Sequence, residues 1–124
     1  MRVLLSIKPE FVERIFDGSK KYEYRKSIFK RSGVRAVVIY ASTPVKRVVG
    51  EFLIEDILTD DIDTIWELTK NQSGITRTEF QLYFHQKTLA NAIKIGAVTK
   101  YDNPMLLSDL NIENAPQSYC YISD

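Results

Sequence analysis

Three charged side chains lie close together early in the chain and could bind or activate a ligand. Lys20, Glu23 and Arg25 follow Gly18 within a short run. If residues 20–25 are extended, Glu23 and Arg25 point to one face of a strand and Lys20 to the other, unless a turn at Gly18 twists its start. Charged groups gathered at the mouth of a hairpin can form a site, and they are also typical of a solvated sheet edge.

Each of these side chains has two interpretations. An ammonium group acts as a nucleophile only if burial or a neighbouring cation lowers its pKa. Pairing with Glu23 would keep the pKa of Lys20 high, and we favour a phosphate or carbonyl anchor. Arg25 can hold a phosphate or a base edge with two hydrogen bonds, or form a salt bridge to Glu23 that only shapes the hairpin. Glu23 can accept hydrogen bonds from a base amino group.

The charge of the chain is unevenly distributed. The net charge is +1, yet residues 20–35 carry seven basic side chains against one acidic side chain, and residues 51–67 are rich in acidic ones. A basic segment on a nearly neutral protein is typical of a surface that faces phosphates, or of a hairpin kept soluble by lysines. The candidates for contacts to phosphates are Lys26, Lys30, Arg31 and Arg35.

The remaining composition argues against several classes of function. His85 and Cys120 are the only residues of their types, so a zinc site is not expected and an internal disulfide is impossible. A lone cysteine fits a reducing, cytoplasmic setting, and no apolar run approaches the ~20 residues of a membrane span. No GxGxxG, Walker or GxSxG motif is present, and we expect no cofactor.

Apolar periodicity predicts an α+β fold and a single domain over residues 1–124. Strands are predicted at residues 3–8, 20–25, 34–40, 46–58, 87–101 and 118–122, helices at residues 9–16, 62–69 and from 76, and a helical turn at 106–110. Gly50 and Gly96 predict bulges in long strands, and Asn103-Pro104 predicts a turn. Thr76 and Glu79 match a capping box. Together these elements predict a curved mixed sheet, or a small partly closed barrel.

Several motifs resemble a known family. Gly18-x-Lys20-x-x-Glu23-x-Arg25, placed after a strand and a short helix, resembles the GxKxxExR signature of the ASCH domain, a family of the PUA-like superfamily. The resemblance extends over most of the chain, through residues 6–9, 40–44, 49–52, 80–84, 92–95 and 116–119. These segments look like the ASCH subgroup described as predicted transcriptional regulators.

The resemblance implies a PUA-like mixed β-barrel of about five to six strands, with two to three short helices packed around it and a cleft beside the first helix. It implies a nucleic-acid-binding domain linked to transcription or translation, with RNA or a modified nucleotide as its partner. Residues expected to bind this ligand are Lys8, Lys20, Glu23, Arg25, Lys26, Lys30, Arg31, Ser42, Gln117 and Ser118. A regulator that acts through protein contacts, with a small ligand in the cleft, is a third interpretation.

The same resemblance implies an alternative in which the protein is an enzyme. One ASCH branch hydrolyses N4-acetylcytidine and another cleaves RNA, and Lys20 matches the proposed nucleophile or base of the first branch. Glu23 stands where that branch has a threonine, and Glu79 is the nearest match to its assisting glutamate, although the capping box is the simpler role. Lys20, Glu23 and Glu79 would then be catalytic. Strand tyrosines could stack on a base, or pack in the core: Tyr22, Tyr24 and Tyr40.

Overall fold

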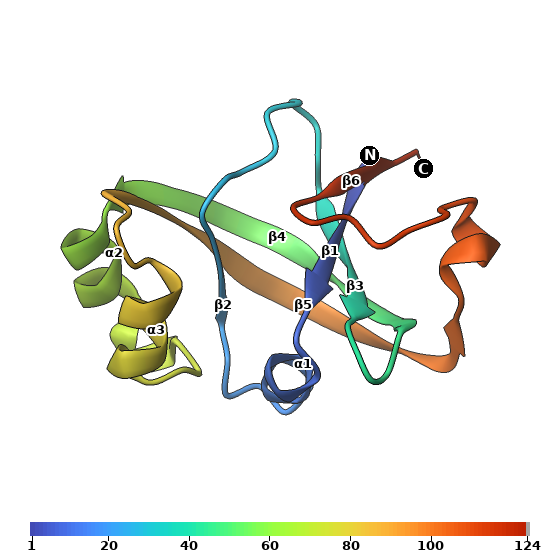
Figure 1. Ribbon diagram of the computed structural model, residues 1–124, viewed down its shortest axis with the longest axis horizontal. Helices are drawn as coiled ribbons and strands as arrows, with labels where there is room; N and C mark the ends of the chain where they lie inside the picture. The colour runs from blue at the N-terminus through green and yellow to red at the C-terminus, as the bar shows by residue number, and fades with distance from the viewer. Residues whose placement is uncertain (124) are drawn as a thin grey trace.

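The computed structural model describes residues 1–123 and contains one six-stranded mixed sheet (Figure 1). The strands are β1 (Arg2–Ile7), β2 (Tyr22–Arg25), β3 (Ala36–Ala41), β4 (Arg47–Asp61), β5 (Leu89–Met105) and β6 (Cys120–Ile122). The helices are α1 (Pro9–Phe16), α2 (Ile62–Thr69) and α3 (Arg77–Tyr83), with 3₁₀ turns η1 (Lys70–Gln72) and η2 (Leu107–Leu110). None of the helices within residues 1–123 combines the length and the apolar character needed to cross a membrane.

The strand order is β2-β5-β4-β3-β1-β6, and only β1 and β3 pair in parallel. This confirms the predicted α+β class and the predicted order of elements. The predicted barrel, however, is not closed. In the described residues β2 and β6 form opposite edges of the sheet and do not pair with each other (Figure 1).

β4 and β5 extend beyond their predicted C-terminal ends. β4 runs on to Asp61, whose side chain caps α2, and β5 continues through Asn103 and Pro104, where a turn was predicted. Lys100 of β5 pairs with Gly50, and the next pair joins Met105 to Val48. The proline therefore falls in a bulged stretch, where its missing N–H costs no regular ladder bond.

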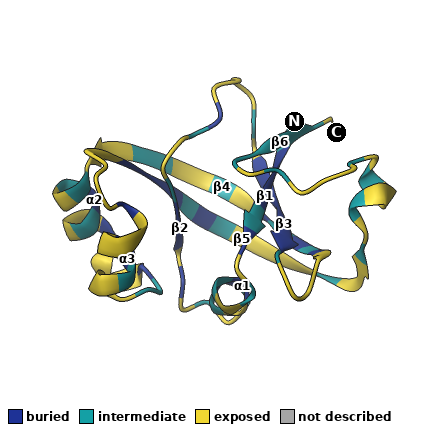
Figure 2. Cartoon of the chain, viewed as in Figure 1, coloured by how far each residue is buried: buried dark blue, intermediate teal, exposed yellow. Residues whose placement is uncertain are grey.

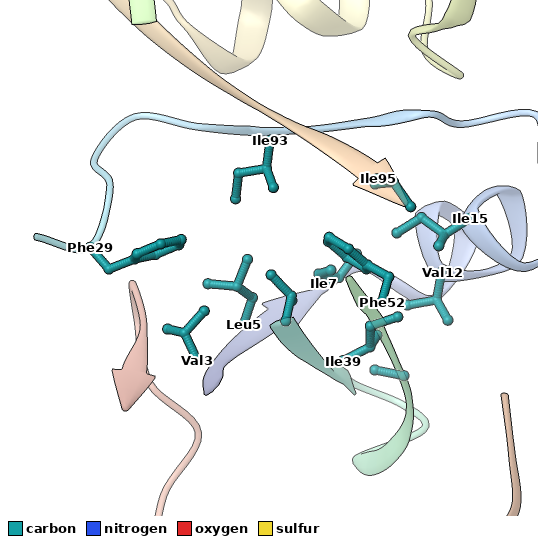
Figure 3. Close-up of a cluster of buried hydrophobic side chains, with 12 residues drawn as sticks. Val3, Leu5, Ile7, Val12, Ile15, Phe29, Ile39, Phe52, Ile93 and Ile95 are labelled. Atoms are coloured by element: carbon teal, nitrogen blue, oxygen red, sulfur yellow. The ribbon is translucent and has the colours of Figure 1, made fainter. Parts of the chain in front are cut away.

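The main core lies between α1 and the centre of the sheet. Val3, Leu5 and Ile7 of β1 alternate with residues of the opposite face and meet Val12 and Ile15 of α1. Figure 3 shows these side chains together with residues of β3, β4 and β5, and with Phe29 from the loop after β2 on the side opposite α1. The middle strands are accordingly buried, whereas the far ends of β4 and β5 are exposed (Figure 2).

Two smaller clusters cover the rest of the sheet. Leu4 and Val38 face away from α1 and pack under the segment that contains η2. At the other end, an aromatic cluster joins Tyr24 of β2 to Phe80 of α3 and to Phe84, which follows the helix. This second cluster fixes α3 beside β2 and so builds one wall of the site described below.

Helix α1 and a turn at Gly18 precede β2 and determine where this strand begins. Pro9 starts α1, and Asp17 ends it with a backbone hydrogen bond to Glu13. Gly18 then adopts φ +86°, a conformation that favours glycine, and the backbone N–H of Lys20 donates to the carbonyl of Arg14 at 2.9 Å. The regular strand starts only at Tyr22, so Lys20 does not follow the strand alternation predicted for it.

Candidate functional site

A cavity of about 640 Å³ lies between the start of α1, the end of β2, α3 and residues 117–118. Lys20, Glu23 and Tyr24 lie among its lining residues together with Arg25. Its volume is in the range typical of small-molecule sites. The signature residues thus line a cavity, as their resemblance to a known family implied.

Lys20 is a buried cation in this cavity, with 2% of its surface exposed. Its Nζ lies 3.8 Å from Glu23 Oε1 and donates a long hydrogen bond of 3.4 Å to the carbonyl of Ser73. The same ammonium lies 4.8 Å from the ring centroid of Tyr24 and 5.4 Å from that of Phe11. Two aromatic faces therefore help to stabilise a charge that has little access to water.

Burial lowers the pKa of the Lys20 ammonium below its ordinary value. The Glu23 carboxylate raises this pKa again, Arg14 lowers it and Glu79 raises it, but the loss of hydration is the largest effect. The expectation that pairing with Glu23 keeps the pKa of Lys20 high is therefore wrong, because the sequence did not show how deeply Lys20 is buried.

Glu23 and Arg25 are tied into the frame of the site. Arg25 Nη1 lies 3.3 Å from Glu23 Oε2 and donates to the carbonyl of Ser6 at 3.2 Å, and its Nη2 donates to the carbonyl of Ser118 at 2.8 Å. These contacts favour the salt-bridge interpretation of Arg25 over a free phosphate fork. Glu23 lies between both cations, one carboxylate oxygen toward each.

Glu79 lines the cavity while it caps α3. Its carboxylate accepts from the backbone N–H of Thr76 at 2.8 Å, and the Thr76 hydroxyl accepts from the N–H of Glu79 at 3.0 Å. The predicted capping box is confirmed. The hydrogen bond from Thr76 lowers the pKa of the Glu79 carboxyl, and Arg14, 3.5 Å away, lowers it further. Glu79 is thus an ionised group at neutral pH.

The other candidate residues divide into two groups. Lys8, Lys26, Gln117 and Ser118 line the cavity. Lys30, Arg31 and Ser42 do not: the first two lie on the exposed loop after β2, and Ser42 lies in the hairpin between β3 and β4, where its N–H donates to the carbonyl of Ile7. Among the described residues, no three His, Cys, Asp or Glu side chains are grouped to hold a metal ion.

The strand tyrosines belong to the core. Tyr22, Tyr24 and Tyr40 are each buried, and the Tyr24 hydroxyl donates to Thr69 Oγ1 at 2.7 Å. Burial raises the pKa of Tyr24 to about 12. The tyrosine at the rim of the cavity is instead Tyr83 of α3, and Lys26 Nζ lies 4.8 Å from its ring centroid.

Several lining residues were not among the sequence candidates. Phe11, Leu82 and Tyr83 supply apolar surface, and Ser27 shares a 2.9 Å hydrogen bond with Ser118. Leu82 is 72% exposed, although the helical pattern places most leucines inward. The run Leu82-Tyr83-Phe84 places apolar residues on more than one face of a helix, and this is a sequence signal that could have marked the rim.

Comparison with known proteins gives matches over most of the chain. The model of the ASCH domain family matches residues 5–99. An ASCH domain-containing ribonuclease of Zymomonas mobilis is 30% identical over 89 residues, which cover 72% of this chain and 60% of that protein. The crystal structure of ASCH from Zymomonas mobilis superposes with a TM-score of 0.89 at 26% identity and covers 98% of this chain and 87% of that one.

A second relative is a much longer protein. A large ribosomal subunit protein, uL22, of Ureaplasma parvum is 30% identical over 120 residues, which cover 97% of this chain but only 39% of that protein. The chain therefore spans less than two thirds of the length of the curated relatives it matches.

Proposed function

Because the chain belongs to the ASCH domain family, we propose that its cavity binds RNA or a modified nucleotide. The observation that carries this proposal is the ammonium of Lys20, buried in an open cavity whose wall also holds the exposed cations Lys8 and Lys26. A buried cation beside an opening favours an anionic or strongly polar ligand.

The names of two relatives support RNA as the ligand class. The Zymomonas mobilis relative is named a ribonuclease, and the Ureaplasma parvum relative is named a ribosomal protein. We further propose that residues 1–124 form one RNA-binding domain with a role linked to translation. The loop after β2 would extend the site, since Lys30 and Arg31 are exposed and continue from Lys26 at the cavity wall.

Equilibrium binding of short single-stranded RNA, measured by fluorescence anisotropy at several salt concentrations, tests this proposal. Lys20→Met should weaken binding about tenfold or more, roughly the loss of one charge-assisted hydrogen bond. Lys21→Met is the matched control, because Lys21 is the exposed neighbour and does not line the cavity. Absence of RNA binding at low salt, or equal loss in both variants, would contradict the proposal.

The loop makes a separate contribution that the salt dependence isolates. Lys30→Ala with Arg31→Ala should weaken binding and reduce the slope of log K against log salt by about 1.4, the value for two phosphate contacts on a single strand. Lys46→Ala with Arg47→Ala is the control, an exposed Lys-Arg pair in the hairpin between β3 and β4. If the slope of log K against log salt is unchanged in Lys30→Ala with Arg31→Ala, the loop after β2 does not contact the RNA.

Hydrolysis through Lys20 is a second candidate function, favoured by the lowered pKa of its ammonium. A lowered pKa increases the fraction of neutral amine, which can act as a nucleophile or base. Incubation with RNA and with a nucleoside panel that includes N4-acetylcytidine should then show turnover that rises with pH and is lost in Lys20→Met. Turnover that survives in Lys20→Met would exclude Lys20 as the catalytic group.

A further inference from the structure

The loop between η1 and α3 contacts Lys20 directly, although it lies some fifty residues away in sequence. The N–H of Lys21 donates to the carbonyl of Gln72 at 2.9 Å, and Lys20 Nζ donates to the carbonyl of Ser73. Gly74 packs on the Lys20 side chain so closely that a Cβ at this position would lie 2.3 Å from Lys20 Cβ and 2.5 Å from its Cα. Only glycine allows this approach, and it also adopts φ +68° here.

Arg14 connects this loop to α1 and to Lys20. Its guanidinium Nη1 donates to the carbonyl of Gly74 at 2.9 Å and lies 3.5 Å from Glu79 Oε1. Its own backbone carbonyl accepts the N–H of Lys20 at 2.9 Å. One residue of α1 thus contacts both the backbone that carries Lys20 and the loop that covers its side chain.

We propose that Arg14 and Gly74 are positioning residues, which hold the loop of residues 72–75 against Lys20 and thereby fix its ammonium in the cavity. Gly74 sets the distance between the loop and the Lys20 side chain, and Arg14 fixes the loop through the Gly74 carbonyl. The functional consequence rests on the proposed role of Lys20 in ligand binding, while the positioning itself can be tested on the free protein.

Arg14 also acts on Lys20 through its charge. The charged groups that face Lys20 are Glu23 from β2, Arg14 from α1 and Glu79 from α3, while Arg25 is engaged by Glu23. Arg14 lowers the pKa of Lys20, and both glutamates raise it. Removal of the Arg14 charge should therefore raise the pKa of Lys20, and a lysine at position 14 should largely restore it.

Lysine side-chain NMR measures this pKa without any ligand. The Lys20 signal is assigned by its absence in Lys20→Met and then titrated in wild type, Arg14→Met and Arg14→Lys. We expect an upward shift of the Lys20 midpoint in Arg14→Met and a return toward the wild-type midpoint in Arg14→Lys. If Arg14 only filled space, Arg14→Met and Arg14→Lys would not differ in the Lys20 midpoint according to the charge at position 14.

Gly74→Ala tests the contact itself, with Gly33→Ala as the matched control. Gly33 has φ +82°, so both variants force alanine into a left-handed conformation, but nothing lies within 4 Å of a Cβ at position 33. We expect Gly74→Ala to move the Lys20 signal and to weaken RNA binding at least several-fold, and Gly33→Ala to leave the Lys20 signal at its wild-type position.

The proposal is overturned if the Lys20 signal and midpoint in Arg14→Met equal those of wild type and Gly74→Ala behaves like Gly33→Ala. If Gly74→Ala fails to fold, the Arg14→Met and Arg14→Lys pair decides, since Arg14 is partly exposed and does not belong to the hydrophobic core. A wild-type protein that shows no RNA binding refutes the proposed function, and the titration still decides whether Arg14 and Gly74 position Lys20.

Discussion

The site contains one buried carboxylate between two cations. Glu23 lies between Lys20 and Arg25, and only 2% of Lys20 and 5% of Glu23 are exposed. Burial of an ion is costly unless neighbours replace its hydration, and here the Ser73 carbonyl and the rings of Phe11 and Tyr24 do so for Lys20. Together, Lys20, Glu23 and Arg25 retain one positive charge, which favours a ligand that carries a negative charge.

Tyr24 gives a prediction that separates hydrogen bonding from packing. Tyr24→Phe keeps the ring against Phe80 and removes the hydroxyl that donates to Thr69, so we expect a loss of about 0.5–1.5 kcal/mol in the free energy of unfolding near pH 8. The pKa of Tyr24 is raised from 10.0 to about 12 in the folded protein. Between these values the folded state holds the proton longer than the unfolded state, so the wild type loses stability as the pH rises.

The difference in free energy of unfolding between wild type and Tyr24→Phe should therefore shrink above pH 10, because phenylalanine does not titrate. Urea unfolding of both proteins from pH 8 to 11 measures this difference, and contributions of other ionisable groups cancel in it to first order. A difference that stays constant or grows above pH 10 would contradict the raised pKa of Tyr24.

At the scale of elements, local sequence determined much of what was predictable. Pro9 starts α1, Gly18 forms the turn that follows this helix, and Thr76 and Glu79 cap α3, all as the sequence indicated. These features depend on residues within a few positions of each other. The cavity that contains Lys20, Glu23 and Arg25 was expected from their resemblance to the ASCH signature, whereas their spacing alone placed Lys20 on the opposite face of a strand.

The rest depends on contacts between distant segments, which local patterns do not encode. The burial of Lys20 requires the loop around Gly74, and the engagement of Arg25 requires the carbonyl of Ser118. Lys30 likewise contacts a distant residue, Tyr121, whose hydroxyl accepts the Lys30 N–H. The open sheet also depends on which strands pair, which the strand pattern alone does not show.

Gly50 gives a prediction for the packing of β4 against β5 and α1. A Cβ at this position would lie 2.5 Å from the carbonyl oxygen of Thr99 and 2.9 Å from Cζ of Phe16. Because a backbone carbonyl cannot move aside, Gly50→Ala should lower the free energy of unfolding by about 1–3 kcal/mol. Gly96→Ala is the control, because the nearest atom to a Cβ at position 96, the carbonyl oxygen of Leu53, would lie 3.0 Å away. Urea denaturation should rank Gly50→Ala below Gly96→Ala, and the reverse order would contradict this account.

At the scale of the whole molecule, the C-terminal segment connects parts of the chain that are far apart in sequence. β6 lies beside β1 at the edge of the sheet (Figure 1). Ser118 binds Arg25 and Ser27, and Tyr121 binds the loop after β2. The same segment thus covers one edge of the sheet, contributes to the cavity wall and fixes the basic loop.

Tyr121 provides the most direct test of this connection. Its hydroxyl accepts the backbone N–H groups of Lys30 at 3.0 Å and Arg31 at 3.1 Å, while the Arg31 guanidinium lies 4.5 Å from its ring centroid. Tyr121→Phe keeps the stacking and removes the acceptor, so hydrogen exchange of these two amides should become faster while exchange in β1 stays unchanged. Tyr101→Phe is the control, because it loses a hydrogen bond to Glu51 instead. Exchange at Lys30 and Arg31 that is equal in wild type and Tyr121→Phe would mean that the loop is held by its own turn and by Phe29 rather than by the C-terminal segment.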